Sequence, residues 1–218
     1  MSSSIGSAIQ QRYGALASQE TNLSCGSAAS RVEPEPGALC VDLGCGRGKD
    51  VLLLAGKVGP GGHVFGIDGS AEMISAARRR ADQQDVINVT FWKASLEELP
   101  LGDGAIDWVV SNCALNHAQD KARVWREIAR VLAPGGHFVV SDIYAVEPIA
   151  PEWRDDPVAV AECWAGAELR DEYLAQVAAA GLFELKVSEE SKPYRRGHAV
   201  LASFTLSGRK PNEKEVVE

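Results

Sequence analysis

The chain has 218 residues, 45% of them hydrophobic and 24% charged, and this ordinary globular balance excludes wholesale disorder. Thirty acidic residues against 22 basic ones give a net charge of −8. This argues against a nucleic-acid partner, because a basic face normally supplies most of that affinity. No apolar run approaches the roughly 18 residues of a membrane span, and no leader pattern opens the chain. We therefore expect one large domain, located in the cytoplasm and with no membrane partner.

Strands and helices alternate from residue 38 onward. The apolar pattern predicts strands at 38–43, 63–68, 89–93, 106–112 and 137–143, and helices at 50–58, 71–84 and 120–132. Strands joined by helices of this length indicate right-handed crossovers and a parallel sheet that is covered on both faces.

The pattern changes after residue 144. Helical segments are expected at 156–165 and 169–180, followed by two β-rich runs at 183–190 and 198–207 that form an antiparallel hairpin at one sheet edge. The predicted fold is therefore α/β, a doubly wound Rossmann-like sheet of seven strands, six parallel and one antiparallel. We expect residues 1–36 to form an N-terminal lid or substrate segment and 37–209 the main domain. Within that domain, 144–187 would be an acceptor-site insertion, and 210–218 a flexible tail.

A glycine cluster follows the first predicted strand. Gly44, Gly46 and Gly48 alternate with other residues before the next helix, which lets a ligand approach the backbone closely. Asp68 stands 24 residues after Gly44, at the end of the second strand, where it can accept hydrogen bonds from ribose hydroxyls. The third glycine follows the second by two residues, whereas the dinucleotide fingerprint has three. Asp42 at the strand end suits a cationic ligand better than a pyrophosphate, so the motif favours S-adenosylmethionine over NAD.

A wider set of motifs resembles the class I S-adenosylmethionine-dependent methyltransferases. The set comprises Val41–Gly48, Phe65–Asp68, Leu99-Pro100, Asp107–Val110 and Leu132–Gly136, and it covers about half of the chain. The resemblance implies S-adenosylmethionine as the cofactor, with its methionine end on the glycine loop, its ribose on Asp68 and its adenine near Met73. Ser95 stands where the family often has an acidic residue. The implied cofactor contacts are Asp42, Gly44, Cys45, Gly46, Gly48, Asp68, Gly69, Met73, Ser95, Leu96 and Asn112.

Three cysteine segments carry a more specific resemblance. Ser111-Asn112-Cys113, Cys163-Trp-Ala-Gly-Ala167 with Glu172-Tyr-Leu174, and Cys25-Gly26 are similar to segments of the arsenite methyltransferases. The resemblance implies that Cys25, Cys113 and Cys163 bind trivalent arsenic as thiolates and that a thiol reductant restores them. Soft thiolates select a soft centre, and an arsenic lone pair needs alignment rather than a general base.

Two features depart from that family. No cysteine precedes Cys25, whereas the arsenite enzymes commonly carry one more, so the thiols are re-reduced by another route or the acceptor is another thiophilic compound. The region 144–187 leaves less room for a separate metalloid-binding domain. Each cysteine taken alone is also explained by burial as a small hydrophobe.

His117 supports an alternative function. It follows the Cys113 segment and could act as general base for an organic hydroxyl, amine or carbon acceptor, with the cysteines as bystanders. An exposed turn histidine is the plain structural explanation. A non-catalytic, thiol-rich sensor of a metalloid or of the cofactor and, more distantly, a nicotinamide oxidoreductase also stay open, as does the oligomeric state.

Overall fold

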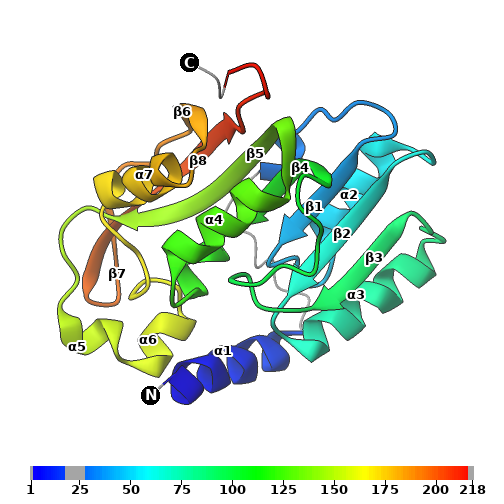
Figure 1. Cartoon of the computed structure of the whole chain (residues 1–218). Coiled ribbons are helices and arrows are strands. Elements are labelled where there is room, and N and C mark those ends of the chain that lie inside the picture. Colours follow the sequence, from blue (N-terminus) through cyan, green and yellow to red (C-terminus); the bar gives the residue numbers. More distant parts are fainter. Residues whose placement is uncertain (1, 18–27, 216–218) are drawn as a thin grey trace.

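A single mixed sheet runs through the computed structural model, which describes residues 2–17 and 28–215 (Figure 1). Its strands lie in the order β3-β2-β1-β4-β5-β8-β6, and the short β7 pairs with β8. The strands are β1 (Leu39–Leu43), β2 (His63–Asp68), β3 (Val89–Lys93), β4 (Ile106–Asn112), β5 (Leu132–Ala145), β6 (Phe183–Ser188), β7 (Tyr194–Arg196) and β8 (Ala199–Arg209).

The sheet direction follows the sequence prediction. The first five strands pair in parallel, β8 is antiparallel to β5, and β6 is antiparallel to β8. The seven strands of the main path therefore comprise six that run one way and one that opposes them, as expected. The described strands number one more than predicted, because the three residues of β7 add a short antiparallel partner to β8. The strand β8 also inserts between β5 and β6, so β6 forms the sheet edge.

Helices cover both faces of the sheet. The cores of α2 (Lys49–Val58) and α3 (Ala71–Gln83) share one apolar cluster with η1 (Ala28–Arg31). On the opposite face, α4 (Lys121–Val131) and α7 (Arg170–Ala179) pack around the buried Trp125 and Tyr173, and α4 lies in front of the sheet in Figure 1. The boundaries of α2 and α3 agree with the predicted helices to within one residue.

The N-terminal segment is helical, which was not predicted from the sequence. Helix α1 (Ser2–Leu16) lies across the lower edge of the sheet in Figure 1, below the ends of the parallel strands. It packs against α3 and against α6 (Pro157–Ala161). This places α1 over the edge at which ligands of such sheets bind. The division into an N-terminal segment, a main domain and a tail stays a prediction.

The predicted helix at 156–165 is wrong in extent. The structure has α5 (Pro151–Arg154) and then α6, which Asp156 caps by accepting hydrogen bonds from the amides of Val158 and Ala159 at 2.8 and 2.9 Å. Helix α6 ends before Cys163, whose φ of 73° lies in the left-handed region and cannot continue a right-handed helix.

The fifth strand is longer than predicted. It begins at Leu132, five residues before the expected start at 137, directly after α4. Leu132 already has an extended backbone and pairs with Ile106, and Pro134 favours extended backbone at the residue before it. In the described part of the chain, no helix combines the length and the apolar character that a membrane crossing requires. The cytoplasmic location stays a prediction.

Gly166 provides a test of how the segment after α6 is held. A Cβ atom at Gly166 would lie 1.9 Å from the backbone oxygen of Asn116. We expect Gly166→Ala to lower the free energy of unfolding by about 1–3 kcal/mol, because neither backbone can move without disturbing its packing. Gly56→Ala, in the last turn of α2 with nothing within 4 Å of the added Cβ atom, should raise it by about 0.5–1 kcal/mol. Urea denaturation of both variants measures the two changes, and equal midpoints would contradict this packing.

Candidate active site

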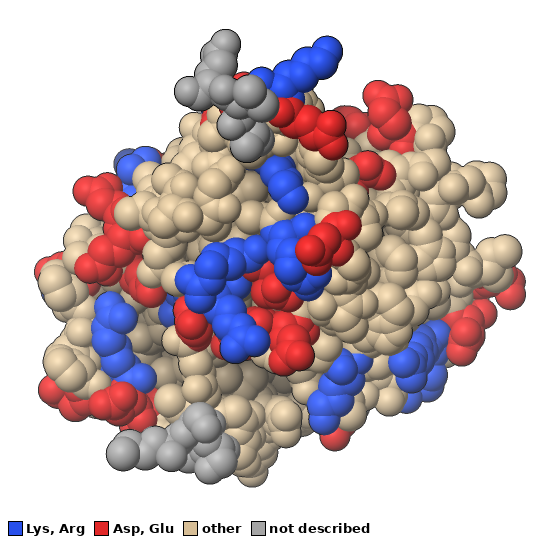
Figure 2. Space-filling model, viewed as in Figure 1, with Lys and Arg blue, Asp and Glu red and all other residues tan. Residues whose placement is uncertain are grey.

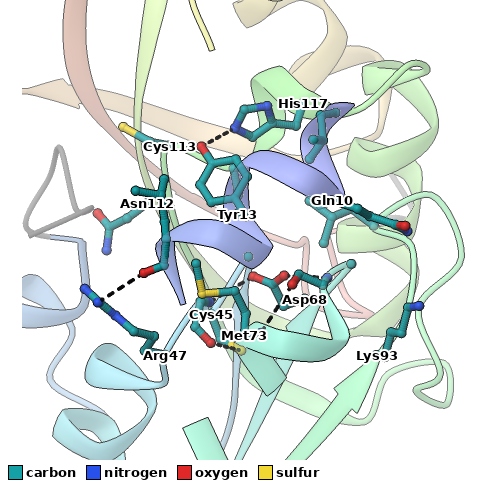
Figure 3. Close-up of a pocket in the computed structure, with 18 of the residues that line it drawn as sticks. Gln10, Tyr13, Cys45, Arg47, Asp68, Met73, Lys93, Asn112, Cys113 and His117 are labelled. Atoms are coloured by element: carbon teal, nitrogen blue, oxygen red, sulfur yellow. Dashed lines mark hydrogen bonds between the residues drawn. The ribbon is translucent and has the colours of Figure 1, made fainter. Parts of the chain in front are cut away.

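A cavity of about 1490 Å³ opens where the parallel strands end. Its walls come from the loop after β1, the ends of β2 and β4, the segment after β3, helix α1 and the residues around Cys163. Figure 3 shows Asp68, Cys45 and Met73 at one end and Cys113, Tyr13 and His117 at the other. The cavity therefore joins the predicted cofactor loop to two of the three predicted thiols.

Close packing of the glycine loop explains its composition. Gly44 has a φ of 73°, and a Cβ atom there would lie 2.2 Å from the Cβ of Ala114. Gly46 has a φ of 50° and donates its amide hydrogen to Asp68 at 2.9 Å. Gly48, predicted as a cofactor contact, is the N-cap of α2 and is not among the residues that line the cavity; a Cβ atom there would lie 3.0 Å from Ala77 and 3.1 Å from a ring of β3.

Three carboxylates surround this loop. Asp42 is 3% exposed, and burial raises its pKa well above the usual range, with Asp50 and Asp68 adding repulsion. Burial also raises the pKa values of Asp50 and Asp68, although each accepts hydrogen bonds that oppose the shift. A cationic ligand would relieve this desolvated negative charge, whereas a pyrophosphate would increase the repulsion. These three carboxylates therefore fit the positively charged sulfonium and ammonium groups of S-adenosylmethionine.

The other predicted cofactor contacts lie along the same wall. Those that line the cavity are Asp42, Gly44, Cys45, Gly46, Asp68, Gly69, Met73, Ser95, Leu96 and Asn112. The Ser95 hydroxyl donates to the carboxylate of Glu97, which also lines the cavity. Glu97 therefore supplies an acidic side chain next to Ser95, the position at which the resembled family often has an acidic residue. The Asn112 side chain is held by Asp50 and by the amide of Ala28.

Two of the three predicted thiol ligands lie together. The Cys163 sulfur lies 3.4 Å from the backbone oxygen of Cys113, although 50 residues separate them, and both residues line the cavity. Both also have positive φ values, 52° at Cys113 and 73° at Cys163, which cost about 1–3 kcal/mol each for residues other than glycine. Asp85, Glu184 and Glu189 have similar φ values outside the cavity lining, so the position of the two cysteines in one cavity is what distinguishes them. Cys25, the third predicted ligand, lies outside the described residues.

His117 lies beside Cys163 at the same end of the cavity. Its Nε2 atom is 2.8 Å from the Cys163 sulfur and 2.8 Å from the Tyr13 hydroxyl (Figure 3). Burial lowers the pKa of His117 to about 4, so the imidazole is neutral near pH 7. Burial and the adjacent Cys163 raise the pKa of Tyr13, which therefore stays protonated.

The other described cysteines have different surroundings. Cys40 is fully buried in β1, and burial raises the pKa of its thiol to about 12, which makes it inert. Cys45 lies in the cofactor loop, and burial beside Asp42 raises its pKa well above the usual range. In residues 2–17 and 28–215, no group of three histidine, cysteine or acidic side chains is placed to hold a metal ion.

Tyr13 and Asp50 are site residues that were not predicted from the sequence. Tyr13 lies on α1, which reaches the cavity only in the folded chain, and no local spacing relates it to His117. Asp50 did have a sequence signal: it stands in the first turn of the helix that follows the glycine loop, where a carboxylate faces the same ligand.

Protonation of the three carboxylates should weaken cofactor binding. We expect the Kd for S-adenosylmethionine to rise as the pH falls from 8 to 5, because the raised pKa of Asp42 brings its protonation into reach and removes attraction for a cation. Titration calorimetry at several pH values measures this. S-adenosylhomocysteine, which lacks the sulfonium charge, should depend less on pH, and Asp42→Asn should flatten the S-adenosylmethionine curve. A Kd that does not change with pH would contradict this electrostatic role of the loop.

Comparison with known proteins identifies the family. A family model described as a methyltransferase domain matches residues 34–186. An arsenite methyltransferase of Halobacterium salinarum is 36% identical over 201 residues, which span 88% of this chain and 51% of that protein. An arsenite methyltransferase of Aquipseudomonas alcaligenes is 41% identical over 138 residues, or 60% of this chain and 40% of that protein. The chain thus spans about half or less of the length of these curated relatives.

A solved structure agrees with this result. The crystal structure of an arsenic(III) S-adenosylmethionine methyltransferase from Chlamydomonas reinhardtii superposes with a TM-score of 0.74 at 28% identity. The match covers 94% of this chain and 74% of that one. A demethylmenaquinone methyltransferase of Listeria monocytogenes is 32% identical over 120 residues, 55% of this chain and 50% of that protein. The Rossmann-like fold and the prediction of S-adenosylmethionine as cofactor are confirmed, and the chain belongs to the S-adenosylmethionine-dependent methyltransferase domain family.

Proposed function

We propose that this chain transfers a methyl group from S-adenosylmethionine to trivalent arsenic that is bound by the thiolates of Cys25, Cys113 and Cys163. One observation carries the proposal. Cys113 and Cys163, far apart in sequence, lie side by side in strained conformations, in the same cavity as the glycine loop. The meeting of two thiol-bearing residues at the end of the cavity opposite the cofactor loop supports binding of the acceptor by both of them.

The chemistry fits the groups present. When bound, S-adenosylmethionine supplies a methyl group on a positively charged sulfur. Asp42 and Asp68 hold the cationic and ribose parts of that molecule, and the thiolates hold arsenic with its lone pair directed at the methyl group. Because this lone pair carries no proton, no base has to act on the acceptor, and the residues contribute mainly by alignment.

The relatives give independent support. Two curated relatives at 36% and 41% identity, and the solved structure at 28%, are named for arsenite or arsenic(III) methylation. A thiol reductant, needed to restore the thiols, stays a prediction from the sequence.

A second candidate is methylation of an organic acceptor. It is favoured by the pairing of His117 with Tyr13 in the cavity and by the 32% identity to demethylmenaquinone methyltransferase. There His117 would take a proton from the acceptor, and Cys113 would be dispensable. The non-catalytic sensor would bind its ligand and form no S-adenosylhomocysteine.

Cysteine replacement separates these functions. Reduced protein is incubated with arsenite and S-adenosylmethionine, and arsenic species are separated by chromatography with elemental detection. We expect methylated arsenic from the wild type. We also expect a loss of about 100-fold or more in Cys113→Ala and Cys163→Ala, because an acceptor held in the wrong place no longer lies in line with the methyl group.

The matched control is Cys40→Ala, which removes a buried thiol from β1 away from the cavity and should keep the wild-type rate. Calorimetry confirms that each variant still binds S-adenosylmethionine. Absence of methylated arsenic from a wild type that binds the cofactor would contradict the proposal. Formation of S-adenosylhomocysteine with an organic acceptor, lost in His117→Gln and kept in Cys113→Ala, would establish the second candidate.

A further inference from the structure

Cys163, one of three described cysteines that line the cavity, contacts an imidazole. Its sulfur lies 2.8 Å from Nε2 of His117 and is 7% exposed as a residue, so bulk water has little access to it. The other ring nitrogen of His117, Nδ1, lies 3.2 Å from the backbone oxygen of Val160. A carbonyl oxygen only accepts hydrogen bonds, so Nδ1 carries the ring hydrogen and Nε2 is left with a lone pair, which the Cys163 thiol and the Tyr13 hydroxyl both approach to 2.8 Å.

Nε2 is a basic atom in contact with the thiol. Because burial holds the pKa of His117 at about 4, Nε2 takes the thiol proton only as the sulfur bonds to an electrophile, and not beforehand. The thiol of Cys163 can also donate to the backbone oxygen of Cys113 at 3.4 Å, but an amide oxygen is not basic enough to take the proton. The Tyr13 hydroxyl, 2.8 Å from Nε2 and 3.9 Å from the sulfur, can donate to either atom and closes the pair from the side of α1. The arrangement is a nucleophile in hydrogen-bond contact with a base whose orientation a third group fixes.

We propose that His117 accepts the proton of the Cys163 thiol while the sulfur replaces an oxygen ligand on trivalent arsenic. In this step the sulfur–arsenic bond forms and one arsenic–oxygen bond breaks. Nε2 takes the thiol proton and passes it to the departing hydroxide, which leaves as water. Nothing is oxidised or reduced. The inference rests on the proposed function and deepens it: His117 serves the thiol that captures the acceptor. In this step His117 acts as a general base and then as a general acid.

The rate at which Cys163 is alkylated tests this directly, and without arsenic. Wild type and His117→Gln are treated briefly with iodoacetamide, and the modification of each cysteine is followed by peptide mass spectrometry. A glutamine side chain can accept a hydrogen bond but cannot take the proton. We expect the alkylation of Cys163 to slow by at least about tenfold and that of Cys113, in the same sample, to stay unchanged.

The direction of the change separates this role from a structural one. If His117 merely packed against Cys163, its replacement would open the site and speed the alkylation of this buried thiol. The control His63→Gln makes the same substitution at a histidine that pairs with Thr90 across β2 and β3, and it should leave Cys163 unaffected. An unchanged or faster alkylation of Cys163 in His117→Gln overturns the proposal.

Wild type alone supplies a second test if the variant does not fold. Cys45 and Cys163 are equally exposed, at 7%, and both line the cavity, but the proposal gives a base only to Cys163. Cys163 should therefore react faster than Cys45, and the reverse order overturns the proposal. Failure of either alkylation test with methylated arsenic still formed by the wild type removes only the role of His117. If alkylation of Cys163 slows in His117→Gln but the wild type forms no methylated arsenic, the arsenite function is contradicted. The pairing of the Cys163 thiol with the His117 imidazole is then still supported.

Discussion

The site depends on the contact between the ends of β1 and β4, which are neighbours in the sheet. Residues 43 and 111 are opposite each other, and the Ser111 hydroxyl donates a buried hydrogen bond of 2.8 Å to the backbone oxygen of Leu43. After these residues, β1 leads into the glycine loop and β4 into the Cys113 segment. The two segments remain in contact where Gly44 lies against Ala114. A Cβ atom at residue 44 would clash with Ala114, so the close approach of the loop to that segment requires glycine there. The place is the one where open parallel sheets bind ligands.

Two energetic costs are concentrated around this contact. One is electrostatic: Asp42 is almost fully buried beside Asp50 and Asp68, and burial of its charge is unfavourable until a cation approaches. The other is conformational, in the left-handed backbones of Cys113 and Cys163. Under the proposed function, the cofactor offsets the first cost and the acceptor the second, so the site is ready for two ligands of different chemistry, one cationic and one thiophilic (Figure 3). On the face shown in Figure 2, basic and acidic side chains are interleaved. This mixture of charges differs from the continuous basic surface that is typical of a nucleic-acid site.

The strands and the main helices could be predicted because their apolar residues recur at a regular period. The glycine loop could be predicted because its backbone conformation requires glycine at positions that are close together in the sequence. The extended start of the fifth strand agrees with the backbone preference before Pro134. The break at Cys163 is a left-handed conformation that a cysteine does not prefer, so no local signal predicts it. Cys113 and Cys163 could be nominated only by resemblance to a family, since 50 residues separate them and no spacing links a strand end to a turn after α6. The contact between Tyr13 and His117 had no sequence signal at all, because it arises from the packing of α1 across the sheet edge. His117 was singled out as a base for the acceptor, and in the structure its Nε2 atom lies 2.8 Å from both the Cys163 sulfur and the Tyr13 hydroxyl.

Arsenic K-edge X-ray absorption of the reduced protein with one equivalent of arsenite tests the central claim most directly, because it identifies the atoms bound to arsenic without requiring turnover. We predict three sulfur neighbours in the wild type. We predict two sulfurs and one oxygen in each of Cys25→Ser, Cys113→Ser and Cys163→Ser, and no change in Cys40→Ser. Oxygen neighbours alone in the wild type, or a sulfur count that stays the same when Cys113 and Cys163 are replaced, would contradict arsenic binding by these thiolates.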